Sequence, residues 1–194
     1  MPELPEVETM RRGVLPVVGS CLKAIDFVAS PYKKIRITPR RDAFRRRAEG
    51  QRIIEIGRLG KRVLIHLRNN HSIVIEPRMT GLLLLTDPPN REHLRVGFQL
   101  TDGPVPWLWF WDRRGLGSVR LMSANQLARE LGPDRLGPDA LVITPDQLRE
   151  RLRKSRRAIK VALLDQKAVA GVGNLYASEL LHEAKVHPEK RCNQ

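Results

Sequence analysis

The hydrophobic pattern of this chain changes period once, and that change limits the folds open to it. Up to Met122, apolar residues occur in short runs, and clusters of Gly, Pro, Asn and Asp separate these runs. Short apolar runs between turn residues predict β-strands, and many short strands in succession predict a sandwich or a barrel. The runs cover residues 22–28, 53–56, 63–67, 73–75, 82–85, 94–100, 107–111 and 119–122.

Helical signals lie on both sides of this strand-rich stretch. Residues 2–18 are expected to form an opening helix, because Glu3, Glu6 and Glu8 suit the positive end of a helix. After Met122, the sequence Ser-Ala-Asn-Gln at 123–126 is a capping-box pattern. It predicts a short helix that ends near residue 131.

A second helical segment follows a stretch rich in Gly and Pro. Residues 132–139 nearly repeat Gly-Pro-Asp and predict a linker. Residues 144–147 then supply a Thr N-cap, a Pro in the first turn and a Gln three positions after the cap. A helical period runs from there to about residue 183, with a break at 171–174. We therefore predict an α+β chain: a β-sandwich domain with a leading helix at 1–131, a linker at 132–144 and a helical domain at 145–194.

The charge of the chain indicates a polyanionic partner. Lys and Arg number 35 against 21 Asp and Glu, which gives a formal net charge of +14. Residues 33–47 hold eight basic side chains against one acid, and residues 149–160 hold seven against Glu150. One cluster alone is better explained as a solvated face, but two in a chain this basic favour a polyanion-binding surface, with nucleic acid preferred to an anionic membrane.

Compartment and metal content are also constrained. No apolar run approaches the roughly 20 residues that span a bilayer, and the acidic N-terminus lacks the apolar core of a signal peptide. Cys21 and Cys192 provide neither a disulfide framework nor a four-cysteine zinc site. We expect a cytoplasmic protein without a membrane partner.

The N-terminus carries a candidate nucleophile. If Met1 is removed, Pro2 presents a terminal amine, whose ordinary pKa is about 7.7–8.0, against about 10.4 for a lysine. A neutral secondary amine can attack an electrophilic sugar carbon and form an iminium ion, and the neighbouring Glu3 can protonate a sugar oxygen or the leaving group. Taken alone, this dipeptide is more typical of an ordinary frayed chain end.

The wider sequence resembles one family along its whole length. Residues 1–13, MPELPEVETMRRG, closely resemble the start of the bacterial formamidopyrimidine-DNA glycosylases, base-excision repair enzymes that remove oxidised purines and nick the DNA. Further resemblances follow in the family's order: Gly-Lys at 60–61, Met-Thr-Gly at 79–81, Asp-Arg-Arg-Gly-Leu-Gly at 112–117, and its helix-two-turn-helix region at 158–160 and 171–179.

The resemblance implies roles for the N-terminal residues and for a hairpin lysine. Pro2 would be the nucleophile, Glu3 the proton donor, and Glu6 would help to hold the terminus. Lys61 would lie near the lesion, contact phosphate and assist β-elimination. By itself Lys61 is an ordinary solvated hairpin lysine.

Three further residues would fill the gap that the everted base leaves. A glycosylase must flip its target base out of the stack, at a cost of a few kcal/mol. By resemblance Met79, Arg114 and Leu116 would occupy that gap, and an unbranched apolar wedge with a guanidinium that pairs with the orphan base suits the task. Taken singly, Met79 is more simply a core methionine and Arg114 a surface charge.

The helical domain and one loop supply the remaining candidates. The glycine turn at 171–174 precedes a helix, so its backbone amides can hold phosphate, and Asn174 is expected to cap that helix. Arg156 and Lys160 would grip phosphates beside it. Tyr176 is assigned either to this surface or to an apolar helix face. His93 stands where the family has a DNA-contacting histidine, but a plain loop histidine fits nearly as well.

The chain departs from the family pattern at several points. Leu116 replaces an aromatic wedge, Gly115 an arginine and Arg113 a proline, and Glu-Pro-Arg at 76–78 replaces His-Leu-Gly. The family continues into a four-cysteine zinc finger, whereas this sequence ends at Gln194 with no Cys-x-x-Cys. We therefore expect no metal or other cofactor in this chain.

These observations lead to one preferred function and two alternatives. We expect a monomeric DNA glycosylase and AP lyase that binds damaged double-stranded DNA in a cleft between its domains. It would remove 8-oxoguanine and formamidopyrimidines through a Schiff base at Pro2 and nick the strand by β,δ-elimination. The alternatives are a DNA-binding fragment, non-catalytic or with lyase activity only, and an endonuclease VIII-like enzyme for oxidised pyrimidines. Leu4 favours the purine branch.

Overall fold

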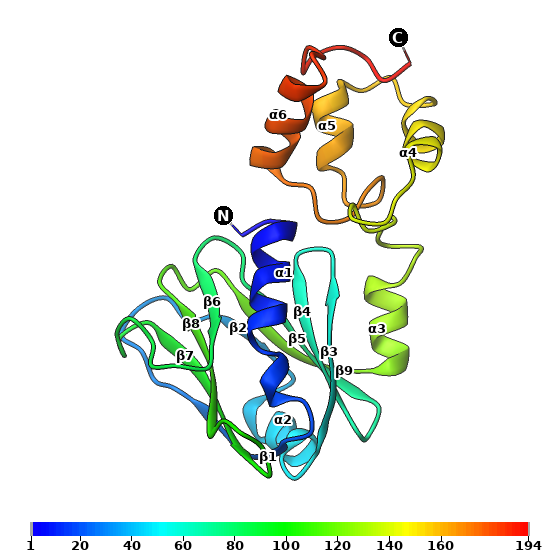
Figure 1. The fold of residues 1–194 in the computed structure, drawn as a ribbon. Coiled ribbons are helices and arrows are strands. Elements are labelled where there is room, and N and C mark those ends of the chain that lie inside the picture. Colours follow the sequence, from blue (N-terminus) through cyan, green and yellow to red (C-terminus); the bar gives the residue numbers. More distant parts are fainter. Residues whose placement is uncertain (1, 194) are drawn as a thin grey trace. The chain divides into compact units, whose positions relative to one another are not determined.

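A computed structural model describes residues 2–193, and the chain divides into two compact units, Met1–Leu127 and Ala128–Gln194. The first unit has two β-sheets, with strand orders β1-β7-β8-β6 and β2-β9-β5-β4-β3 (Figure 1). Neighbouring strands are antiparallel except β2 and β9, which are parallel. The strands are β1 Cys21–Phe27, β2 Arg36–Thr38, β3 Ile53–Leu59, β4 Arg62–Leu67, β5 His71–Glu76, β6 Gly81–Leu84, β7 Leu94–Thr101, β8 Trp107–Asp112 and β9 Ser118–Ser123.

The core of this unit forms from inward-facing residues of both sheets and from two helices. Val7 of α1 (Leu4–Gly13) and Phe44 of α2 (Arg41–Ala48) are fully buried in it, together with strand residues such as Ile65 and Phe110. All eight predicted strands are present, within a few residues of the expected ends, and the α+β class is confirmed.

The structure corrects two details of the first unit. The opening helix, expected to reach residue 18, ends at Gly13 and tightens into a 3₁₀ turn at Leu15–Val17, because Pro16 has no amide hydrogen to continue it. β2 and α2 were not predicted, since they lie within the basic cluster 33–47. Only the buried Phe44 and Ala48, four positions apart, mark the inner face of α2.

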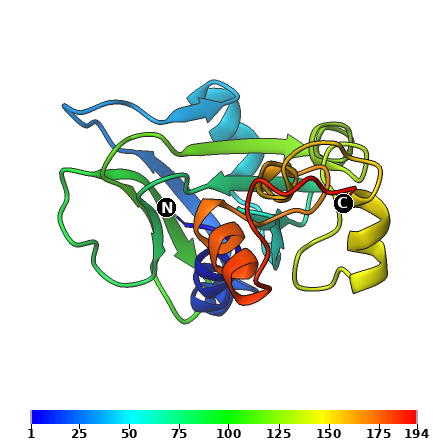
Figure 2. The same ribbon diagram turned by 90° about the horizontal axis from the view of Figure 1, so that it is seen from above.

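Two loops of the first unit project on the same side. These are the loop after β1 and the loop after β6, coloured blue and green in Figure 2. Ser30 Oγ donates to the Glu92 carbonyl oxygen at 3.0 Å, and Tyr32 Oη donates to Glu92 Oε2 at 3.3 Å. These bonds tie the two loops together.

The second unit is helical, and its caps form as the sequence predicts. It contains the C-terminal half of α3 (Ala124–Leu131), then α4 (Pro145–Leu152), α5 (Ile159–Leu164) and α6 (Asn174–Glu183). Thr144 and Gln147 cap α4 reciprocally, with amide-to-side-chain distances of 3.1 and 3.2 Å. The corresponding distances at the start of α3, between Ser123 and Gln126, are 2.9 and 3.3 Å.

Three expectations for this region need correction. The helical run breaks at 153–158 as well as before α6. The N-cap of α6 is Gly173, so Asn174 is the first helical residue and does not cap the helix. The segment expected to be a linker packs within the second unit, because Ala140 donates to the Ala170 carbonyl at 3.0 Å and Ala170 donates to that of Pro138 at 2.8 Å.

The burial of Phe44 generates a stability prediction. Phe44→Ala is expected to lower the free energy of unfolding by about 3–5 kcal/mol, because it empties a fully buried aromatic site. Urea titration followed by circular dichroism measures this loss. The exposed Arg46→Ala on the same helix is the control, and its effect should stay within about 0.5 kcal/mol. Equal effects of the two substitutions would contradict this account of α2.

Candidate active site

The N-terminal residues are held in one conformation by the start of α1. Glu3 is the N-cap, with only 2% of its surface exposed, and Pro2 is half-buried. The Glu3 amide donates to Glu6 Oε2 at 2.9 Å, which completes a capping box. Glu6 therefore holds the terminus in the structure. Met1, whose removal would free the Pro2 amine, lies outside the described residues.

Lys61 lies in the tight turn between β3 and β4, within electrostatic reach of Glu3. Gly60 and Lys61 form the two-residue turn, and Gly60 has a φ of +55°, which a glycine adopts without strain. Burial lowers the pKa of the Lys61 ammonium, and the positive charge of Arg62 lowers it further. The carboxylates of Glu3 and Glu76 act in the opposite direction. Lys61 is thus a half-buried amine beside Glu3, and not a fully solvated hairpin lysine.

An ion-pair network fixes this turn to α1. Arg58 Nε donates to Glu8 Oε2 at 2.9 Å, and its Nη1 donates to the Gly60 carbonyl oxygen at 3.0 Å. Glu8 also pairs with Arg11 and Arg12, each at 2.8 Å. The hydrogen bond from Arg11, followed by those from Arg12 and Arg58, lowers the pKa of Glu8 from near 4.5 to about 2, although burial opposes this. Arg58 therefore connects Gly60, the residue before Lys61, to α1.

A buried aspartate joins the two loops that carry the predicted wedge. Asp112 is fully buried, and its Oδ1 accepts from Thr80 Oγ1 at 2.6 Å and from the Arg114 amide at 3.2 Å. Its Oδ2 accepts from the Gly117 amide at 2.8 Å. Thr80 Oγ1 in turn accepts from the Arg114 amide at 3.0 Å. The loops 77–80 and 112–117 are therefore one hydrogen-bonded structure.

The wedge candidates project from these joined loops. Met79 is 37% exposed, Arg114 is exposed and Leu116 is half-buried. Gly115 has a φ of +60°, and a Cβ there would lie 2.0 Å from the Lys33 carbonyl oxygen. The segment at Lys33 thus packs directly on the loop, which explains why glycine stands at this position.

His93 has a packed environment. Its ring lies 4.7 Å from that of Tyr32 and 5.6 Å, edge-on, from that of Trp111. Its Nδ1 is buried without a hydrogen-bond partner among the described residues. The predicted contact of His93 with DNA stays a prediction.

The second unit holds the other group of candidates around α5 and α6, which lie side by side (Figure 1). Lys160 Nζ donates to Ser178 Oγ at 2.9 Å, and Ser178 Oγ donates to the Asn174 carbonyl oxygen at 2.9 Å. Gln166 fixes the glycine turn: its Oε1 accepts from the Gly171 amide, and its Nε2 donates to the Val172 carbonyl oxygen, both at 2.9 Å. Ser178, which bonds to both residues, brings Lys160 and Asn174 together.

Arg156 and Tyr176 differ in their surroundings. Arg156 is exposed between α4 and α5 and makes no ion pair within residues 2–193. Tyr176 is half-buried and packs against the core of the second unit. The apolar-face interpretation of Tyr176 therefore has a direct structural basis.

The described residues, 2–193, contain neither a metal-ligating cluster nor a membrane-spanning helix. No three His, Cys, Asp or Glu residues there are grouped to hold a metal ion, so these residues do not fit a zinc site. No helix of the described chain is long and apolar enough to cross a membrane. Cys21 and Cys192 are free thiols.

Comparison with protein families identifies both units. Residues 1–119 match the formamidopyrimidine-DNA glycosylase N-terminal domain, and residues 131–194 match the H2TH domain of the same glycosylases. The chain belongs to the formamidopyrimidine-DNA glycosylase family. It is a DNA glycosylase of base-excision repair.

Individual relatives of this glycosylase agree with the assignment. Formamidopyrimidine-DNA glycosylase of Bacillus subtilis is 41% identical over 199 residues, which cover 100% of this chain and 70% of the relative. The enzyme of Heliobacterium modesticaldum is 38% identical over 200 residues, which cover 100% of this chain and 71% of the relative.

Solved structures of a relative share its fold. The Lactococcus lactis enzyme in complex with DNA containing an oxidised pyrimidine aligns with a TM-score of 0.84 at 33% identity, covering 100% of this chain and 72% of the other. The same enzyme with abasic-site DNA gives 0.83 at 32% identity, with coverages of 99% and 70%.

Sequence reasoning missed the residues that arrange the glycosylase site. Asp112, Thr80, Arg58 and Gln166 hold the loops and turns, yet none was given a role. Asp112 and Thr80 belong to the motifs at 112–117 and 79–81. An aspartate that begins a glycine-containing loop commonly accepts hydrogen bonds from the amides of that loop. Arg58 and Gln166 carry no comparable local signal.

The lowered pKa of Glu8 predicts a pH-dependent contribution to stability. A carboxyl with a folded-state pKa near 2 stabilises the fold fully above about pH 4.5, and this stabilisation is lost as the pH falls towards 2. Glu8→Gln is expected to lower the free energy of unfolding by about 2–3 kcal/mol at pH 7. Its difference from wild type should shrink between pH 4.5 and 2, as measured by urea titration. The exposed Glu55→Gln should show no such trend.

Proposed function

We propose that this glycosylase removes oxidised purines, 8-oxoguanine and formamidopyrimidines, from damaged double-stranded DNA and then nicks the strand as an AP lyase. The Pro2 nitrogen attacks the sugar carbon that bears the damaged base, and the bond to the base breaks. Glu3 donates the proton that the sugar oxygen or the leaving base requires. The attacking amine loses its own proton, and the bond between this carbon and the protonated ring oxygen then opens to give an iminium ion, which is resolved by β,δ-elimination.

The single observation that carries this proposal is the grouping of Pro2, Glu3 and Lys61. The buried Glu3 carboxylate lies directly after Pro2 and acts electrostatically on Lys61. Burial lowers the pKa of Lys61, so a larger fraction of this amine is neutral than of an exposed lysine. A neutral amine can accept the proton that elimination removes from the sugar, while its charged form attracts phosphate.

The joined loops supply the base-flipping function in this proposal. Met79, Arg114 and Leu116 enter the duplex where the damaged base leaves it. Because Asp112 ties both loops together, the wedge enters as a preformed unit and loses little conformational freedom. Leucine in place of an aromatic residue makes the unstacking weaker.

The second unit binds phosphates in this proposal. Lys160, Asn174 and the amides at the start of α6 grip the backbone beside the lesion, and Arg156 adds charge. Tyr176 and His93 are weaker candidates, because both rings pack against neighbouring side chains. The enzyme acts as a monomer, in the cytoplasm with the nucleoid, and uses no cofactor held by this chain.

Borohydride trapping tests the nucleophile. Reduction in the presence of abasic-site DNA should link the protein covalently to the DNA through its N-terminal peptide. Pro2→Gly should weaken the trap, because it replaces the secondary amine. Protein that retains Met1 should not trap at all, since the Pro2 nitrogen is then an amide. A cross-link found solely at a lysine would remove Pro2 from this role.

Leu116 predicts a selective gain on substitution. Leu116→Phe should speed excision of an intact 8-oxoguanine by about tenfold, the lower end of the roughly 1–3 kcal/mol that aromatic stacking on a base contributes. Cleavage at a pre-formed abasic site should hardly change, since no base has to be unstacked there. Single-turnover nicking of the two substrates measures both rates, and Leu116→Ala should shift the ratio the other way. Equal acceleration on both substrates would argue against a wedge role.

A further inference from the structure

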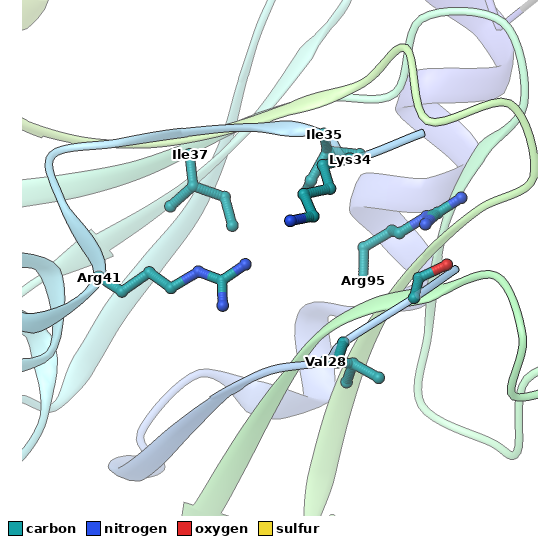
Figure 3. A pocket seen from close by; sticks show the side chains of 8 residues that line it. Val28, Lys34, Ile35, Ile37, Arg41 and Arg95 are labelled. Atoms are coloured by element: carbon teal, nitrogen blue, oxygen red, sulfur yellow. The ribbon is translucent and has the colours of Figure 1, made fainter. Parts of the chain in front are cut away.

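A cationic cavity lies between the loop after β1 and the start of α2. Its volume is about 190 Å³, and its lining includes Lys34, Arg41 and Arg95 but no carboxylate. Apolar side chains, among them Ile35 and Ile37, form other walls. Figure 3 shows the ends of Lys34 and Arg41 pointing into the same space. Two like charges that share a cavity without a counter-charge indicate a place for an anion.

Arg95 adds a buried and incompletely paired charge behind this cavity. It is 3% exposed, and its Nε donates to the Asp112 carbonyl oxygen at 2.9 Å. Both of its Nη atoms are buried without a hydrogen-bond partner within residues 2–193. Burial lowers the pKa of this guanidinium, which the Asp112 charge opposes only in part. In Figure 3 the stem of Arg95 forms the wall while its guanidinium extends away from Arg41, so it acts on the cavity through its charge.

The start of α2 carries cations at the positive end of the helix dipole. Arg40 is the N-cap, with no side-chain hydrogen bond to the helix, and Arg41 is the first helical residue. Cations at the positive end of a helix are unfavourable unless an anion is present, and Asp42 is the acid of this turn. The Arg41 guanidinium also lies 5.6 Å from the centre of the Phe27 ring, which holds it in position.

The cavity is coupled to the wedge loop on two sides. The Lys33 carbonyl, next to Lys34, lies against Gly115, and Arg95 binds the Asp112 carbonyl. A charge held in the cavity therefore lies behind the loop that carries Arg114. None of the cavity's lining residues belongs to the catalytic or wedge candidates.

We propose that this cavity binds one phosphate-type oxyanion, held directly by Lys34 and Arg41. Its volume corresponds to about six groups of water size, at about 30 Å³ each, which accommodates a tetrahedral anion. The anion is either a phosphodiester of the bound DNA or free inorganic phosphate, and the two share this chemistry. The DNA source rests on the proposed function, whereas the free-anion source does not.

Matched double variants of the full chain test the proposal. Lys34→Gln with Arg41→Gln removes the two cations that point into the cavity. Arg46→Gln with Arg47→Gln removes the same charge from exposed positions of α2 outside the cavity. Thermal melting in chloride checks that both variants fold.

The first measurement is affinity for a duplex with an abasic-site analogue. The cavity variant should bind about tenfold more weakly at low salt than the control variant, with a salt slope shallower by about one. A methylphosphonate scan should then find one phosphate whose neutralisation weakens wild type but not the cavity variant. That result assigns the anion to the DNA.

The second measurement compares melting in phosphate and in chloride at equal ionic strength. A phosphate-specific rise in Tm for wild type and control, absent from the cavity variant, assigns the site to free phosphate. If the two double variants behave alike in both measurements, the proposal is wrong. Borohydride trapping at saturating abasic DNA should be unchanged in the cavity variant. If wild type itself is not trapped, the proposed function is wrong, and the proposal of an anion site is unaffected.

Discussion

The fully buried Asp112 carboxylate is the interaction on which the arrangement of the wedge depends. Its carboxylate accepts from Thr80 of one loop and from the Arg114 and Gly117 amides of the other, and its own carbonyl accepts from the buried Arg95. A buried carboxylate is costly unless its acceptors are filled, so the loops are stable only in the conformation that fills them. The positions of Met79 and Arg114 follow from that requirement, and not from contacts of their own side chains.

Carboxylates that accept several hydrogen bonds also fix the N-terminal region, here through Glu6 and Glu8. Glu8 joins α1 to β3 through Arg58, and the second donor of Arg58 reaches the turn that carries Lys61. Glu6 closes the capping box around Glu3. The nucleophile candidate and the proton donor at the start of α1, and the lysine in the β3–β4 turn, are therefore on two elements that acidic side chains connect.

Prediction from sequence succeeded where a signal was local and failed where partners are distant in the chain. The eight strands and the caps at Ser123 and Thr144 follow from alternation and residue spacing, and the structure contains all of them. α2 was missed because four of its eight residues are arginines and only two, Phe44 and Ala48, are buried. The catalytic and wedge candidates came from motif resemblance. Their supports, such as Arg58 with Glu8, join residues 50 positions apart, which no periodicity encodes.

The two basic clusters recognised in the sequence differ in how much of their charge is paired with acids in the structure. In residues 149–160, Arg153 and Lys154 pair with Glu150, Arg157 pairs with Asp165, and Lys160 donates to Ser178. Much of that charge is therefore engaged within the second unit, and a phosphate there competes with existing partners. In residues 33–47, acids engage only Arg45 among the described ion pairs. The charge of this cluster is thus largely available to an external anion. The sequence alone does not distinguish it from the cluster at 149–160, since either resembles a solvated face.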